Sequence, residues 1–271
     1  MNPLYWLDLR VRVRERRLWI MPLFFLLIPL LQVVLAMLGA YTTEVIQPGE
    51  VGTTVAMFAI FTQAGLLILL SPLASAQRIS QEREQRTYAA LANSTMTPSA
   101  LARGKLLGAW TFTLWLSALT LPFVLGAALW GGLELWVYLA CFALNVLVGL
   151  TLSTLALGLS GLFGRSLSAY LAAGAVLFLW CFAFPMFGGL TFGLLSSSVT
   201  KSLVVNQVIM GGFFFHHPVA PQIWMVMRGS GVPSVFQDWG GWVPALGVGV
   251  WLLLNLLGYA LAVRGLRREV Y

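Results

Sequence analysis

The chain has 271 residues, of which 59% are apolar and only 9% are charged. A water-soluble domain carries about 25% charged residues, so this composition argues against a soluble globular protein and indicates a protein of the lipid bilayer. The net charge of +7 comes from basic residues that flank apolar runs and form no single basic groove. We therefore expect no nucleic-acid partner and assign these charges to the orientation of membrane helices.

The first segment, residues 3–17, mixes basic and apolar side chains. We expect an interfacial helix on the cytoplasmic membrane surface, with its arginines among anionic lipid head groups; the alternative is a disordered basic tail. The apolar run that follows is too long for the core of a secretory signal, so it predicts an uncleaved first span. The arginines concerned are Arg10, Arg12, Arg14, Arg16 and Arg17.

Seven uncharged runs are each long enough for a helix of about 20 residues, the length that crosses the hydrocarbon core, and we interpret all of them except residues 202–227 as spans. Backbone groups in lipid must be satisfied internally, so continuously apolar runs predict helices and not a barrel. The predicted fold is an all-α integral membrane protein with one membrane domain over residues 1–271. Its predicted spans are residues 18–40, 54–76, 104–129, 135–159, 168–190 and 243–263.

The basic residues also orient these spans. All Lys and Arg residues except Lys201 and Arg228 fall on one side of the six-span arrangement. Basic residues favour the cytoplasmic side, so both termini are predicted to be cytoplasmic. The segment 191–242 then lies outside, and its glycines and prolines predict short re-entrant helices in place of a further span.

Much of the charge is concentrated between the second and third spans. Arg78, Glu82 and Arg86 lie four residues apart, which places them in one stripe on a helix. Thr97-Pro98 is typical of an N-cap followed by a proline at the first helical position, so the next helix should begin there. We expect a cytoplasmic helix over 77–96 that docks a soluble partner; the alternative is a solvated helix that only anchors the topology.

The same stretch carries a family resemblance. It contains ISQEREQRT at residues 79–87, then Thr97-Pro98, then GKLL at residues 104–107. This pattern resembles ABC transporter permeases of the type-two exporter class, as do LDLRVRVRERR at residues 7–17 and GLFGR at residues 161–165. The resemblance covers residues 4–190, and it departs from the usual pattern at residues 88–90, where bulkier aliphatic side chains are common in the family.

The resemblance implies a permease that forms the export pathway with a second copy, identical or related. Two separate ATPase subunits would dock on the cytoplasmic side and use ATP and Mg²⁺, and this chain would bind no cofactor. Its only Gly-Lys pair, Gly104-Lys105, lacks the phosphate-loop pattern, so we expect no enzyme activity. The helix over 77–96 would transmit the ATP-driven closure of the ATPase subunits to the membrane helices. The residues implied in this coupling are Arg78, Glu82, Arg83, Glu84, Arg86 and Tyr88. Truncating Glu82 or Arg83 would then weaken docking and leave membrane insertion nearly unchanged.

Four polar residues lie inside the predicted spans: Gln32, Gln63, Asn145 and Asn255. Such residues usually form hydrogen bonds between helices, but Gln63 and Asn145 are also candidates to line the pathway. The small residues around Ser160 predict close helix packing. A serine protease site there would need a nearby histidine, and the only histidines, His216 and His217, are predicted at the opposite face. We expect no metal site.

Two other functional classes remain open. An ion-coupled secondary transporter would need charged groups inside its spans, and the predicted spans have none near the midplane. A membrane assembly or scaffold protein without transport activity is the other alternative. For the permease we expect a multi-pass protein of the plasma membrane, the inner membrane of a bacterium. An uncharged pathway would suit lipid-like or other amphipathic cargo.

Overall fold

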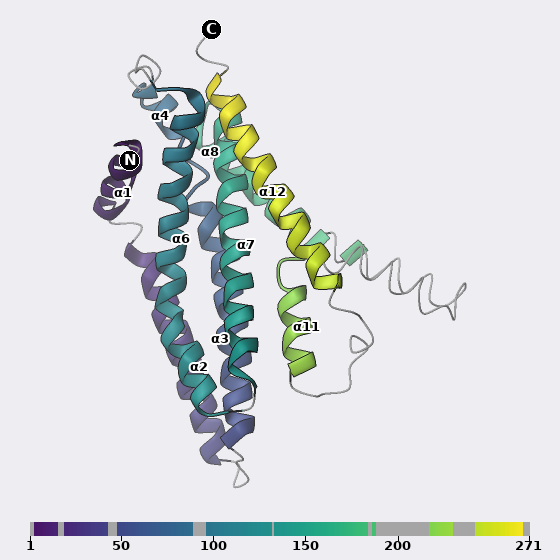
Figure 1. The fold of residues 1–271 in the computed structure, drawn as a ribbon. Coiled ribbons are helices and arrows are strands. Elements are labelled where there is room, and N and C mark those ends of the chain that lie inside the picture. The colour runs from purple at the N-terminus through teal and green to yellow at the C-terminus, as the bar shows by residue number, and fades with distance from the viewer. Residues whose placement is uncertain are drawn as a thin grey trace, which may run out of the picture.

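The computed structural model describes residues 3–15, 19–42, 48–88, 96–131, 133–183, 186–187, 217–229 and 242–267. Within these ranges all regular elements are helices, as the composition predicts (Figure 1). Six of these helices are long and apolar enough to cross a membrane. The protein is therefore an all-helical, multi-pass membrane protein.

The six predicted spans are confirmed in number and place. They correspond to α2 (Ile20–Thr42), α3 (Pro48–Leu73), α6 (Pro98–Leu129), α7 (Leu135–Leu162), α8 (Ser166–Phe178) with its π-helical continuation η2 (Leu179–Ala183), and α12 (Trp242–Arg267).

The helix that contains the third span begins at the Thr97-Pro98 pair, as predicted, ahead of the predicted start of the span at residue 104. Pro98 is its first helical residue, and the Thr97 hydroxyl caps the helix by accepting a hydrogen bond from the Ala100 amide. The resulting 32-residue helix is about 48 Å long, whereas the hydrocarbon core is about 30 Å thick. One end of α6 therefore extends beyond the hydrocarbon.

Helix α7 is the centre of the bundle and packs against α3, α6, α8 and α12. Its contact with α12 is close because both helices present glycine. A Cβ atom at Gly158 would lie 2.5 Å from the Gly258 carbonyl oxygen, and one at Gly161 would lie 3.3 Å from the Ala262 Cα. The small residues around Ser160 thus serve helix packing, as predicted.

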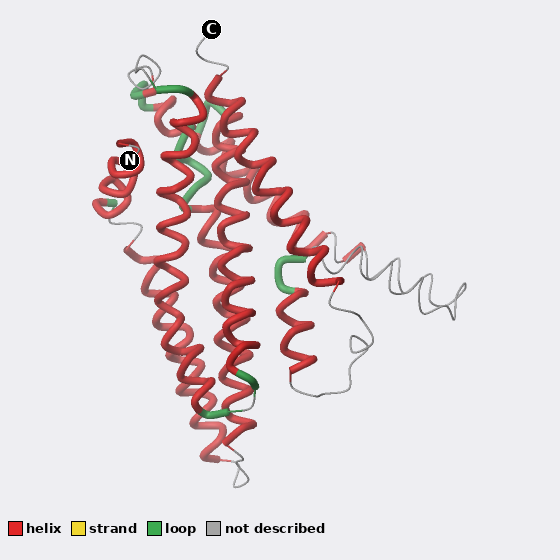
Figure 2. The backbone as a smooth tube through the Cα atoms, in the orientation of Figure 1, coloured by secondary structure: helices red, strands yellow, loops and turns green. Residues whose placement is uncertain are grey.

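Three features gather at one end of the bundle, which we call the α4 end: helix α1 (Pro3–Arg14), helix α4 (Ser80–Glu84) and the C-terminal end of α12 (Figure 1). The C-terminal end of α2, the start of α3 and the described residues between α6 and α7 lie at the opposite end (Figures 1 and 2). Of the predicted outer segment 191–242, the structure describes residues 217–229 and the start of α12. The short helix α11 (Ala220–Gly229) packs beside α7 and α12, and its re-entrant character stays a prediction.

Candidate functional site at the α4 end

The connection after α3 is more sharply folded than one helix over 77–96. Turns occupy residues 74–79, α4 ends at Glu84, and residues 89–95 lie outside the described part of the chain. Arg86 has a φ of 60°, and the Thr87 amide donates to the Glu82 carbonyl at 2.9 Å. This is the Schellman arrangement that terminates a helix. Arg86 therefore does not continue the stripe of Arg78 and Glu82.

Arg78 and Glu82 point into the protein. The Arg78 side chain is only 5% exposed, and its guanidinium donates two hydrogen bonds of 3.1 Å to the carboxylate of Glu15, just after α1. The Lys105 ammonium group, on α6, donates to Glu82 at 2.5 Å and to the Arg78 carbonyl at 3.3 Å. Charge-assisted hydrogen bonds of this kind are the stronger ones in proteins, so the connection is joined firmly to α1 and α6.

Arg83 joins the ends of two long helices. Its guanidinium donates to the carbonyls of Gly161 and Phe163 at 2.9 and 3.0 Å and to that of Gly265 at 2.9 Å. The first two carbonyls terminate α7 and the third lies in the last turn of α12, where helix dipoles favour a cation. The Tyr88 hydroxyl also donates to α12, at the Leu266 carbonyl, at 2.8 Å.

Ser160 holds the beginning of α4. Its hydroxyl oxygen accepts hydrogen bonds from the amides of Ile79 and Ser80, both at 3.0 Å. This serine on α7 thus satisfies amides that a helix start leaves without intrahelical partners. The sequence predicted Ser160 only as a small packing residue, and no motif in the sequence indicates a cap supplied from 80 residues away.

Glu84 extends the network to α8. Its exposed carboxylate accepts hydrogen bonds from the Ser166 hydroxyl at 2.6 Å and the Ser166 amide at 3.3 Å. These two bonds to Ser166, more than the nearby charge of Arg165, hold the pKa of Glu84 below its ordinary value. A carboxylate at the first residue of a helix is also favoured by the helix dipole.

Residues 78–88 therefore contact the α4 ends of five helices, namely α1, α6, α7, α8 and α12, and follow directly from a sixth, α3. The six residues predicted for this site divide into two groups. Arg78, Glu82, Arg83 and Tyr88 make the interior contacts, whereas Arg86 is exposed and Glu84 is exposed but bonded to α8. Together with Gln85 and Thr87, these last two form an outward face, which we call the 84–87 face.

The two pathway candidates lie in a second polar cluster, in the middle of the bundle. The Asn145 amide donates to the Gln63 side chain at 3.0 Å and to the Ile60 carbonyl at 2.8 Å. Gln222 of α11 donates to Asn145 at 2.8 Å. All three side chains are fully buried in the single chain, so the cluster links α3, α7 and α11. The role of Gln222 in this cluster was not predicted, because prolines interrupt its apolar run and the run was therefore not interpreted as a span.

The other polar span residues form hydrogen bonds between helices, as predicted. Gln32 and Thr62 join α2 to α3 with bonds of 2.6 and 2.8 Å. The Asn255 amide donates to the Thr151 hydroxyl at 2.6 Å and joins α12 to α7. Among the described residues no group of His, Cys, Asp and Glu could hold a metal ion.

One expectation for the first helix is wrong. Arg12 was predicted to lie among lipid head groups, but it is 2% exposed and donates to Asp8 at 2.7 Å and to the Ala74 carbonyl at 3.3 Å. Burial lowers the pKa of Arg12, and the charge of Asp8 opposes this shift. The reason is close packing: Asp8 lies directly over Gly108 of α6, where a Cβ atom would collide with its carboxylate. Arg10 and Arg14 are exposed, and their place among head groups stays a prediction; Arg16 and Arg17 lie outside the described residues.

The fold and this site define a multi-pass helical membrane protein whose charged inter-helix connection links the ends of its helices. The model of the family described as ABC-2 family transporter protein matches residues 2–190, which are 189 of the 271 residues. The chain therefore belongs to the ABC-2 transporter family, as the resemblance indicated. No curated protein matches the chain. The matched region runs from α1 through η2 and includes all of the connection after α3.

Proposed function

We propose that this chain is the permease subunit of an ATP-driven exporter and that the connection over 77–96 couples it to separate ATPase subunits. One observation carries the proposal: residues 78–88 contact the ends of α1, α6, α7, α8 and α12. A solvated loop that only anchored the topology would need none of these interior bonds. Membership of the ABC-2 transporter family supports the same reading.

The exposed and the interior residues of the connection have different proposed roles. The 84–87 face is the docking surface, because it is exposed and lies beyond the ends of the spans. The interior group then passes a displacement of this face to the membrane helices. Charge-assisted hydrogen bonds suit this task because they are short and directional. Arg83 is central, since it holds α7 and α12 together at their ends.

The proposed orientation places the α4 end in the cytoplasm. Among the described residues, all Lys and Arg residues except Arg228 lie in α1, in the connection after α3, at the starts of α6 and α8, or in the last turns of α12, which is the α4 end of the bundle. This asymmetry supports cytoplasmic termini and a plasma-membrane location, the inner membrane in a bacterium. ATP and Mg²⁺ would be bound by the ATPase subunits.

The pathway would form between two copies of the permease or between this chain and a related subunit. Helices α2 and α8 support this, because apolar side chains such as Leu27, Leu35 and Leu171 are more than half exposed there and must face lipid or another subunit. Gln63 and Asn145 are fully buried in the single chain, and Asn145 is bonded to Gln222 of α11. They would reach a pathway only when α11 moves away, and they would offer uncharged hydrogen-bonding groups to amphipathic cargo.

The test is purification of the tagged full-length chain from its own membranes, with mass spectrometry of the proteins that accompany it. We expect a subunit with a phosphate-binding loop, and ATP hydrolysis by the complex but not by the chain alone. Hydrolysis by the isolated chain, or the consistent absence of any such subunit, would overturn the proposal. Transport driven by an ion gradient without ATP would instead show a secondary transporter.

A further inference from the structure

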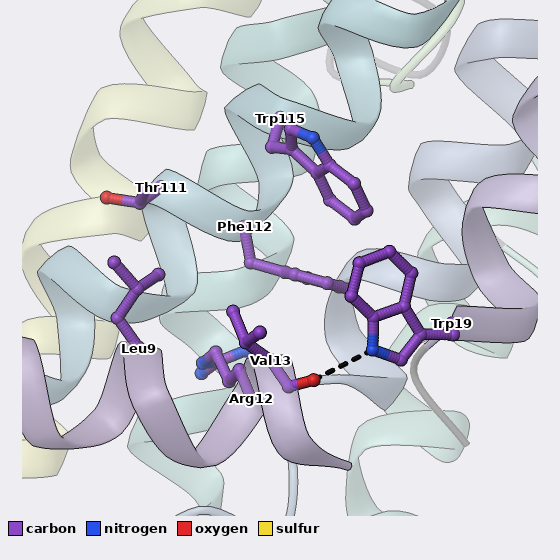
Figure 3. Close-up of a pocket in the computed structure, with 7 residues that line it drawn as sticks. All are labelled: Leu9, Arg12, Val13, Trp19, Thr111, Phe112 and Trp115. Carbon is purple, nitrogen blue, oxygen red and sulfur yellow. Dashed lines mark hydrogen bonds between the residues drawn. The ribbon is translucent and has the colours of Figure 1, made fainter. Parts of the chain in front are cut away.

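An apolar cavity of about 320 Å³ lies between α1, the residue before α2, and α6. Figure 3 shows Trp19, Phe112 and Trp115 on one side of it and side chains of α1 on the other. The ring centroids of Trp19 and Trp115 are 5.9 Å apart, and those of Phe112 and Trp115 are 5.8 Å apart. Its lining is completed by Leu9, Arg12, Val13 and Thr111. We call it the α1 pocket.

The α1 pocket opens at the level where a span enters the membrane. Trp19 immediately precedes the apolar span of α2, and its indole N–H donates to the Val13 carbonyl at 2.8 Å. Three side chains at its mouth are substantially exposed: Val13 at 57%, Trp19 at 51% and Trp115 at 39%. Tryptophan at this depth is typical of the interface between head groups and acyl chains, so the pocket opens toward lipid.

Ordered water is held in a cavity by several polar partners. The lining of this cavity is mainly apolar, so water is a poor occupant. The volume falls within the range of about 300–1,000 Å³ that is usual for small-molecule sites. An acyl chain matches both the apolar lining and the membrane position, and it packs against aromatic rings without any polar partner.

The charge around the pocket favours an anionic head group. Arg12 lines the pocket, and its Nη2 atom is buried without a hydrogen-bond partner in the structure. A buried guanidinium nitrogen of this kind is costly until an acceptor reaches it. Arg10 and Arg14 on the same helix are exposed. Basic residues at a membrane surface attract anionic lipid by about 1 kcal/mol each.

We propose that the α1 pocket binds one acyl chain of an anionic phospholipid from the adjacent leaflet. The chain lies between Trp19, Phe112 and Trp115, and the phosphate meets Arg12 at the inner edge. Arg10 and Arg14 raise the local concentration of anionic lipid. Glu15, which directly follows α1, is ion-paired to Arg78 at the candidate coupling site. By fixing α1, the bound lipid therefore also stabilises the position of Arg78.

The test uses the full-length chain in nanodiscs that contain equal amounts of phosphatidylglycerol and phosphatidylcholine. After release into a mild detergent, native mass spectrometry counts the lipids retained. We expect one phosphatidylglycerol on the wild-type chain, and its loss from Val13→Trp, in which the larger side chain fills the pocket. Leu114→Trp is the matched control, because Leu114 is 48% exposed on the same helix as Trp115 and does not line the pocket. Arg10→Gln and Arg14→Gln should each reduce the preference for phosphatidylglycerol about fivefold.

A second measurement does not depend on a pocket-filling variant. Phosphatidylglycerol with brominated acyl chains should quench the tryptophan fluorescence of the wild type more than brominated phosphatidylcholine does. The Trp19→Phe/Trp115→Phe variant should lose this difference. Equal retention of the two lipids, equal quenching by them, or loss of lipid from both Val13→Trp and Leu114→Trp would overturn the proposal.

Discussion

Replacing Arg83 by methionine should destabilise the protein. Methionine keeps much of the side-chain length but removes every donor, which leaves the carbonyls of Gly161, Phe163 and Gly265 without their partner. A hydrogen bond to a charged group contributes about 1.5–3 kcal/mol. Arg83 is partly exposed, and three bonds to one group are not additive, so we expect a total loss of about 3 kcal/mol.

The measurement is the free energy of unfolding of the full-length chain in mixed micelles. Arg83→Lys should fall between wild type and Arg83→Met, because one ammonium group cannot reach all three carbonyls in the fork geometry of a guanidinium. The matched control is Arg86→Met, three residues away, at an exposed position with no polar side-chain partner in the described structure. Its effect should stay within about 0.5 kcal/mol. If Arg83→Met were as stable as Arg86→Met, Arg83 would not hold α7 and α12 together.

Four further predictions follow from other parts of the structure. Gly108→Ala should displace α1, because the new methyl group would collide with Asp8; faster proteolysis within residues 3–15 would show this, and unchanged cleavage would contradict it. Asn145→Leu should lower the free energy of unfolding by about 2–3 kcal/mol, because Gln63 and Gln222 each lose a buried partner. A loss below about 0.5 kcal/mol, which is typical of a surface substitution, would show that the cluster does not stabilise the bundle. The pKa of Glu84 is lowered from 4.5, so its bonds to Ser166 stabilise the protein at neutral pH, and this stabilisation is lost as the pH falls through the folded pKa. Glu84→Gln should therefore reduce the pH dependence of the unfolding free energy below pH 4.5. An unchanged pH dependence in that range would exclude the contact. For topology, a cysteine at Glu50 should react with an impermeant maleimide only from outside and one at Arg86 only from the cytoplasm, and the reverse pattern would invert the proposed orientation.

The spans could be predicted because the few charges of this chain separate uninterrupted apolar runs, and a bilayer leaves such runs no other regular structure. The Thr97-Pro98 pair correctly predicted the start of α6, whereas the predicted span starts at residue 104 because the apolar run begins later than the helix. The site residues were found by charge and by family pattern. Their partners were not predictable, because Arg83 binds backbone carbonyls, which have no signature in the sequence.

Two local features explain the remaining differences. Helix α4 ends in a left-handed turn at Arg86, a position where glycine is the usual signal. Because the sequence has an arginine there, its pattern predicted that the helix continues. Arg10, Arg12 and Arg14 are alike in the sequence, and the difference among them comes from Gly108 on a distant helix. Only the packed structure shows which of the three is buried.

The glycine contacts between α7 and α12 bear on where this protein can be divided. The family model stops at residue 190, yet α12 lies beyond that point and its backbone fits against Gly158 and Gly161. A chain truncated at residue 190 would leave the backbone of α7 open to lipid at these glycines and would leave Arg83 without its Gly265 partner. We therefore expect that the matched region would not fold on its own, and that α7 and α12 move as one rigid body during any conformational change of the bundle.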